Sequence, residues 1–230
     1  MKVIAPSSEI LFLPEGHEVL GALERYGRTC YKSEDKITPD SAADFVRRII
    51  KSGHHSVIEH AVMTVRFVCD RGVTHELVRH RLAAYSQEST RYANYSQDKF
   101  GGGITVIRPL FWLPGSREYQ TWLQAMEQAE AAYLALLKMG ARPQEARGVL
   151  PNSLKTEIVM TANLREWRHV LGLRSGKASH PQIREIMLPL IDKLRGRLPV
   201  IFDDLHQGYL SEIQDLQRQV DAWEAAAARG

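Results

Sequence analysis

The hydrophobic residues of this chain recur every three or four positions in several long segments, which is typical of amphipathic helices. This spacing, with proline, serine and glycine at segment ends, predicts helices at residues 17–26, 39 to about 52, 116–139, 164–173 and from 181 onward, with a kink at Pro189. A last helix is predicted from Ser211, with one apolar stripe formed by Ile213, Leu216, Val220 and Trp223.

Runs of β-branched and aromatic residues predict strands at residues 60–69, 104–107 and 156–162. Strands mixed with long helices indicate an α/β chain of the mixed α+β kind. The strands are too few and too far apart for a doubly wound Rossmann sheet. No repeat, low-complexity tract or Gly/Ser linker divides the sequence, so we expect one domain over residues 1–230.

Residues 73–82 (VTHELVRHRL) fit a further helix with an apolar side. On that helix Arg81 falls among the apolar residues, so it would be buried and would need an anionic partner. Arg79 falls on the opposite side, about 160° away. If both arginines bind ligand, they serve different ligands or different parts of a large one; otherwise they form ordinary salt bridges.

The composition excludes several function classes. A net charge of +3 over 230 residues argues against a general nucleic-acid coat but leaves room for a local anion pocket.

Cys30 and Cys69 form no C-x-x-C pair, which favours a reducing compartment. The N-terminus does not resemble a signal peptide, and no apolar run approaches the roughly 20 residues of a membrane span. We therefore expect a cytoplasmic protein without a membrane partner.

Two segments gather side chains that suit phosphate groups. The stretch RHRLAAYSQESTRY (79–92) contains three arginines and three Ser or Thr hydroxyls. Arg147, after a short helix near Pro143, and NLREWRHVLGLR (163–174) form a second basic cluster, for which a solvated helix face is the alternative. The glycines at 101–103 precede a strand rather than a helix, which indicates a turn. Neither G-x-G-x-x-G nor G-x-x-x-x-G-K-[ST] occurs, so any nucleotide would be held by side chains or by non-Rossmann backbone.

Metal and nucleophile chemistry have weaker support. His75 and His80 lie five positions apart, as do His55 and His60, whereas H-E-x-x-H requires four. Ser89 has no nucleophile elbow around it, and neither cysteine lies in an electropositive context. We therefore predict no metal site.

The order of these motifs resembles one known family. Arg79-His80-Arg81, seven further residues and Ser89, extended by Arg91-Tyr92, resemble the signature of the flavin-dependent thymidylate synthases, the ThyX family. GHHSVIEH (53–60) resembles another family segment, and Arg147 with residues 163–174 resembles its second nucleotide-binding region. Matching segments run from about residue 53 to 185.

The resemblance implies a methyltransferase that makes dTMP from dUMP. In this family 5,10-methylenetetrahydrofolate supplies the carbon, FAD carries the hydride and NADPH reduces the flavin. The enzymes are homotetramers with sites at subunit interfaces. Their fold has a central sheet flanked by long helices, and it is unrelated to the cysteine-dependent thymidylate synthases.

The resemblance also implies roles for individual residues. The FAD contacts would be Ser56, Arg79, His80, Arg81, Asn163, Leu164, Arg165 and His169. The dUMP contacts would be Glu76, Leu77, Val78, Arg79, Gln87, Glu88, Ser89, Thr90, Arg91, Arg147 and Arg174. Arg174 would be catalytic, because a permanent cation beside the uracil favours its ionisation. Two departures are Gln87, where some members carry Glu, and Ala84, where some carry Ser.

Two other functions fit parts of the sequence. The Arg- and Tyr-rich stretch would suit an RNA- or DNA-binding module, which predicts salt-dependent binding of polynucleotides. The C-terminal apolar stripe would suit an interaction domain that mediates assembly, which alone predicts no flavin.

Overall fold

The computed structural model describes residues 1–97 and 101–229. The strands are β1 (Lys2–Ile4), β2 (Ser7–Phe12), β3 (Val62–Asp70), β4 (Ala83–Gln87), β5 (Thr105–Ile107) and β6 (Lys155–Asn163). The α-helices are α1 (Gly16–Thr29), α2 (Ser41–Lys51), α3 (Arg71–Leu77), α4 (Arg117–Lys138), α5 (Pro143–Ala146), α6 (Leu164–Arg174), α7 (Pro181–Arg197), α8 (Pro199–Gly208) and α9 (Leu210–Ala227). Short 3-10 turns lie at Glu34–Lys36, His55–His60 and Arg147–Val149.

A four-stranded sheet of order β2-β3-β6-β4 forms the centre of the molecule. β3 and β6 are antiparallel and pair over their whole length, from Val62↔Asn163 to Asp70↔Lys155. Because side chains alternate along a strand, Val65 and Phe67 share one face with Met160, and all three are fully buried there. The sheet therefore has one apolar face and one polar face.

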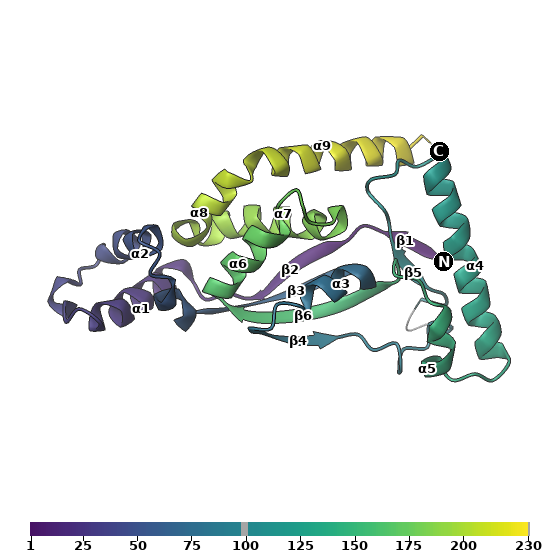
Figure 1. The fold of residues 1–230 in the computed structure, drawn as a ribbon, viewed down its shortest axis with the longest axis horizontal. Helices are drawn as coiled ribbons and strands as arrows, with labels where there is room; N and C mark the ends of the chain where they lie inside the picture. The colour runs from purple at the N-terminus through teal and green to yellow at the C-terminus, as the bar shows by residue number, and fades with distance from the viewer. Residues whose placement is uncertain (98–100, 230) are drawn as a thin grey trace.

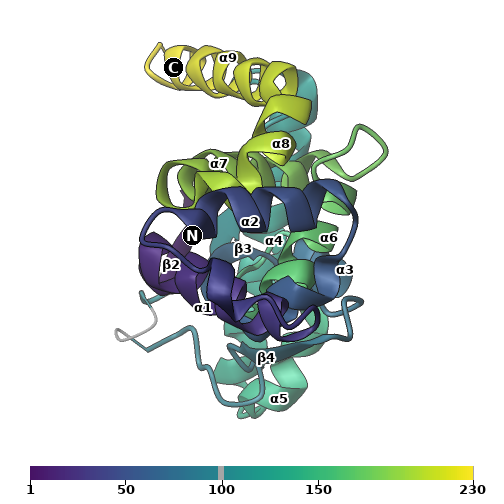
Figure 2. The same ribbon diagram turned by 90° about the vertical axis from the view of Figure 1, so that its left-hand side faces the viewer.

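Helices cover the apolar face (Figures 1 and 2). α6, α7 and α8 lie over the sheet, and α1 and α2 pack at the end away from α4. Trp167 of α6 is fully buried, and its indole Nε1 donates to the Met63 carbonyl of β3 at 2.9 Å. This confirms the predicted mixed α/β fold with a central sheet and long helices, without a Rossmann arrangement.

A second apolar cluster lies at the other end of the molecule, where α4 runs across it (Figure 1). Ser116 caps α4 as predicted, accepting a hydrogen bond from the Tyr119 N–H at 3.1 Å. α9 extends along α7 towards α4, and Trp223 packs against Tyr119. Ile213 packs against the main core, so the predicted C-terminal stripe contacts its own chain at both ends.

The longer elements confirm the sequence predictions to within a few residues. The predicted helix at residues 73–82 is wrong in its second half, because α3 ends at Leu77. The strands β1, β2 and β4 and the helix α8 were not predicted. α7 continues through Pro189. Among the described residues no helix combines the length and apolar character needed to cross a bilayer.

Candidate functional site

The segment between α3 and β4 carries the Arg79-His80-Arg81 motif as a loop. Asp70 caps α3, accepting from the Val73 N–H at 2.8 Å, and the helix ends at Leu77. The Tyr85 hydroxyl faces the carbonyls of Leu77 and His80 at 2.6 and 2.9 Å. These contacts, and the pairing of β4 with β6, turn the chain out of the helix.

This loop overturns the predicted burial of Arg81. Arg79 and Arg81 are both exposed, and neither forms an ion pair or side-chain hydrogen bond within residues 1–97 and 101–229. The residue that points inward is His80, which is 6% exposed. The motif therefore presents two free guanidinium groups outward and one imidazole inward.

Arg174, the last residue of α6, is held against this loop. Its Nη1 donates to Glu76 Oε2 at 2.8 Å, and its Nη2 donates to the Glu76 carbonyl at 3.1 Å. Its Nε donates to His80 Nε2 at 3.0 Å. Contacts to α3 and to the loop thus fix the orientation of the guanidinium group, as expected of a preorganised cation.

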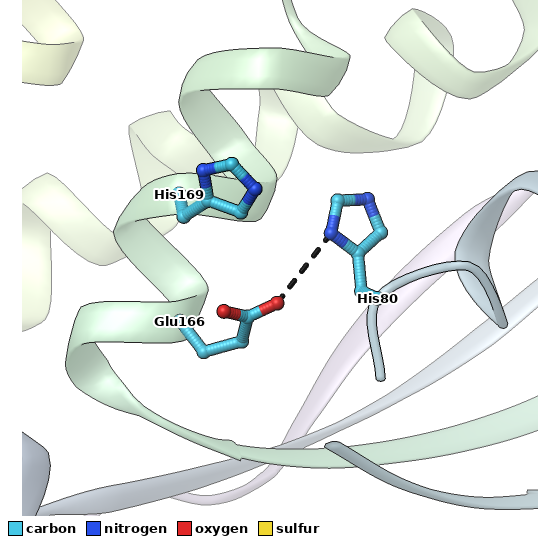
Figure 3. Close-up of side chains that lie close together, drawn as sticks. All are labelled: His80, Glu166 and His169. Carbon is cyan, nitrogen blue, oxygen red and sulfur yellow. Dashed lines mark ion pairs between the residues drawn. The ribbon is translucent and has the colours of Figure 1, made fainter. Parts of the chain in front are cut away.

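The other edge of His80 faces α6 (Figure 3). His80 Nδ1 lies 3.5 Å from Glu166 Oε1, and the His80 and His169 rings lie 5.6 Å apart. Burial, followed by the positive charge of Arg174 and then the nearby His169, lowers the pKa of His80 to about 4. His80 is therefore neutral at physiological pH.

Glu166 is a site residue that the sequence analysis missed. It is buried in the first turn of α6, and its N–H is capped by Asn163 Oδ1 at 2.9 Å. The only signal in the sequence is an Asn-x-x-Glu pattern, which by itself indicates a helix cap. The histidine pairs considered for metal binding also differ from the group that forms: nitrogens of His80 and His169 and an oxygen of Glu166 lie within 4.8 Å of one another.

Most of the residues expected to bind FAD line three adjoining pockets. A pocket of about 780 Å³ is lined by Arg79, His80, Arg81, His169 and Arg174 among others. His169 also lines a pocket of about 720 Å³ with Asn163 and Arg165. Arg165 in turn lines a third, of about 340 Å³, with Ser56. Leu164 is fully buried beneath them and contributes packing.

The residues expected to bind dUMP divide into two groups. Glu76, Val78 and Arg79 line the pocket of Arg174, with Leu77 buried behind them. Gln87 and Glu88 line a different pocket of about 740 Å³ beside the polar face of the sheet.

The second group is held by contacts of its own. The Gln87 amide donates to Thr74 Oγ1 at 3.1 Å, and Lys155 Nζ contacts Glu88 at 3.0 Å. Further along, Arg147 donates to Thr90 Oγ1 at 3.3 Å, and the Arg91 N–H to Ser89 Oγ at 3.3 Å. In the single chain, therefore, the two groups do not share one pocket.

Comparisons with known proteins give a consistent result. The family model described as "Thymidylate synthase complementing protein" (Thy1) matches residues 18–200. Three similar proteins are each named flavin-dependent thymidylate synthase. The one from Corynebacterium efficiens is 33% identical over 220 residues, covering 90% of this chain and 88% of the relative. The one from Geobacter sulfurreducens is 34% identical, covering 80% and 81%. The one from Pyrococcus abyssi is 35% identical, covering 72% and 68%.

A solved structure has a similar fold. It is that of a UMP/dUMP methylase, PolB, from Streptomyces cacaoi, bound with 5-Br dUMP. It aligns with a TM-score of 0.73 at 24% identity, covering 92% of this chain and 97% of that one.

Proposed function

This chain belongs to the thymidylate synthase complementing protein (Thy1) family, the family of the flavin-dependent thymidylate synthases, and we propose that its adjoining pockets around His169 and Arg174 bind FAD and dUMP. The protein is a methyltransferase that converts dUMP to dTMP. 5,10-Methylenetetrahydrofolate supplies the carbon, and NADPH supplies the hydride through FAD.

The donors in the pockets fit a dinucleotide cofactor. Arg79 and Arg81, which form no ion pair or side-chain hydrogen bond among the described residues, line the largest of these pockets, where they would bind the pyrophosphate as forked donors. Asn163, Arg165 and His169 extend the polar lining into the next pocket. When bound, FAD supplies the hydride-transfer chemistry, and these side chains bind and orient it.

The observation that carries the proposal for dUMP is the fixed position of Arg174. Its side chain is only 17% exposed, yet it lines the pocket. A guanidinium held by Glu76 and His80 keeps its charge at all working pH values and needs no reorganisation during the reaction. Placed beside uracil, it would stabilise negative charge on the ring and so activate C5 towards the one-carbon donor.

We also propose that the active site is shared between copies of the chain in a homotetramer. Glu76, Val78 and Arg79 line one pocket, whereas Gln87 and Glu88 line another, so a second copy could supply the group missing from each. Among the described residues, the polar face of the sheet exposes Phe12 and Val62 beside the ion pair of Arg66 with Glu9. Such a face suits a protein–protein contact.

Mixing two inactive variants tests the shared site. Arg174→Ala removes a residue of one group, and Arg91→Ala removes a residue of the other. If one site draws on two chains, co-refolded mixtures regain activity, because roughly a quarter of random sites contain both wild-type residues. If each site lies within one chain, the mixture stays as inactive as its components. Light scattering measures the oligomeric state independently.

Two further proposals concern the domain organisation and the cellular location of the protein. We propose that residues 1–230 function as one domain, because α9 contacts both apolar clusters through Ile213 and Trp223. We propose a reducing, cytoplasmic location, because exposed Cys30 and buried Cys69 are both free thiols.

The role of Arg174 is tested by Arg174→Ala and Arg174→Lys. The alanine variant should bind FAD normally and lose at least about a hundredfold in kcat, the range seen when a preorganised charge stabiliser is removed. The lysine variant should recover part of the rate, because it keeps the charge but not the three fixed donors. Wild-type turnover in the alanine variant would discard the assignment.

A further inference from the structure

We infer that Glu166 is a positioning residue for the reaction, which holds Arg174 in place by fixing the proton of His80. This inference rests on the proposed role of Arg174. Glu166 itself lines the neighbouring pocket and makes no direct contact with Arg174 among the described hydrogen bonds and ion pairs. It acts through the imidazole that lies between them.

The hydrogen-bond chemistry fixes the tautomer of His80. An arginine side chain has donors only, so the contact of Arg174 Nε with His80 Nε2 at 3.0 Å requires a lone pair on Nε2. A neutral imidazole carries a single proton, which must then be on Nδ1. Nδ1 faces Glu166 Oε1 at 3.5 Å, so the buried carboxylate is the acceptor that keeps the proton there (Figure 3).

Loss of that acceptor would release one side of Arg174. With the proton on Nε2, two donors would face each other at the Arg174–His80 contact. The guanidinium would then be held by Glu76 alone, through Nη1 and Nη2. A small rotation about the Glu76 contact would move the Arg174 guanidinium relative to the substrate. Displacements of this kind lower the reaction rate.

The same three side chains also have the donor types of a three-ligand zinc site. That assignment conflicts with the observed contact. A metal bound through His80 Nδ1 would force the proton onto Nε2, which would place two donors 3.0 Å apart at Arg174. In the contact chain Glu166–His80–Arg174 one imidazole nitrogen faces a carboxylate and the other faces a donor, so we assign the cluster to positioning.

The kinetic experiment compares Glu166→Gln with Glu166→Leu in the full-length holoenzyme. Gln keeps a carbonyl oxygen that accepts from Nδ1, so its kcat should stay within about twofold of the wild type. Leu has no acceptor, so kcat should fall about tenfold or more, the effect of losing a hydrogen bond to a charged group. FAD binding is titrated for each variant, so that kcat is compared at saturating FAD. Glu127→Leu, an exposed replacement on α4, is the matched control.

The tautomer is measured directly by ¹⁵N NMR of histidine side chains, assigned with His80→Gln. Wild-type His80 should show a protonated Nδ1 and an unprotonated Nε2, and Glu166→Leu should lose this state. A protonated Nε2 in the wild type overturns the inference, as does wild-type kcat in Glu166→Leu. If Glu166→Leu does not fold, the wild-type spectrum and the Gln variant decide the matter.

The proposed role of Arg174 and the inference about Glu166 are refuted by different results. Full activity in Arg174→Ala would refute the proposed function of that residue, whatever the NMR result. Loss of activity in Arg174→Ala with full activity in Glu166→Leu would refute only the inference about Glu166.

Discussion

Replacing Tyr85 with phenylalanine should loosen the loop that carries Arg79 and Arg81. The Tyr85 hydroxyl lies 2.6 Å from the Leu77 carbonyl and 2.9 Å from the His80 carbonyl, at the two ends of the turn after α3. Burial, together with the charge of Glu166, raises the pKa of Tyr85 to about 12, so the hydroxyl remains a donor at any working pH. Phenylalanine keeps the ring that packs on the core and removes only this donor.

The magnitude follows from the hydrogen bond and its surroundings. One hydrogen bond contributes about 0.5–1.5 kcal/mol net, and a buried carbonyl left without a donor costs about 1–3 kcal/mol. Because the single proton is shared and Tyr85 is only partly buried, we expect the free energy of unfolding to fall by about 1–2 kcal/mol. If about 1 kcal/mol of this loss must be recovered to order the loop when FAD binds, the FAD dissociation constant should rise about fivefold.

The assays are urea unfolding of the apoprotein and a fluorescence titration with FAD. Tyr92→Phe is the control, because the Tyr92 ring is 77% exposed and its hydroxyl forms no hydrogen bond within the described residues. It should match the wild type in stability. Unchanged stability and FAD affinity in Tyr85→Phe would refute the view that this hydroxyl holds the loop.

Three further predictions concern pH, helix capping and thiol reactivity. Folding lowers the pKa of His80 from about 6.5 to about 4. As the pH falls, the unfolded chain therefore binds a proton at His80 before the folded chain does, which favours unfolding. The free energy of unfolding should fall by up to about 3 kcal/mol as the pH drops from 6.5 towards 4. His80→Gln should lack this part of the pH dependence in urea unfolding, and parallel curves would contradict the prediction. Ser116→Ala should cost about 1 kcal/mol of stability by removing the α4 cap without changing FAD affinity, and an unchanged unfolding midpoint would argue against the cap. A thiol reagent should modify Cys30 rapidly and Cys69 only after unfolding, since burial and then Asp70 raise the pKa of Cys69; two rapidly reacting thiols in the native protein would be inconsistent with this.

The sequence predicted the elements whose pattern is local and strong. α4 and α6 have clear helical periods with capping residues, and β3 and β6 are the two buried strands. β2 and β4 are edge strands, and their weaker hydrophobic pattern did not distinguish them from loops.

Part of the candidate site could be predicted from the sequence, but its geometry could not. The resemblance pointed to residues that line one pocket, namely Arg79, His80, Arg81, His169 and Arg174, but it did not separate them from Gln87 and Glu88, which line another. The helical pattern of residues 73–82 was misleading, because contacts of Tyr85 and the pairing of β4 with β6 decide where α3 ends. Glu166 could not be found by pattern, since its contact with His80 joins residues far apart in sequence.

The visible absorption spectrum of the FAD-loaded protein, recorded before and after addition of dUMP, tests whether this protein binds both ligands in one site. If FAD and dUMP occupy adjoining parts of one site, dUMP should shift the flavin bands of the wild type. Arg174→Ala should bind FAD but show a much weaker shift. A folded protein that binds no FAD, or a bound flavin whose spectrum ignores saturating dUMP, would contradict the account.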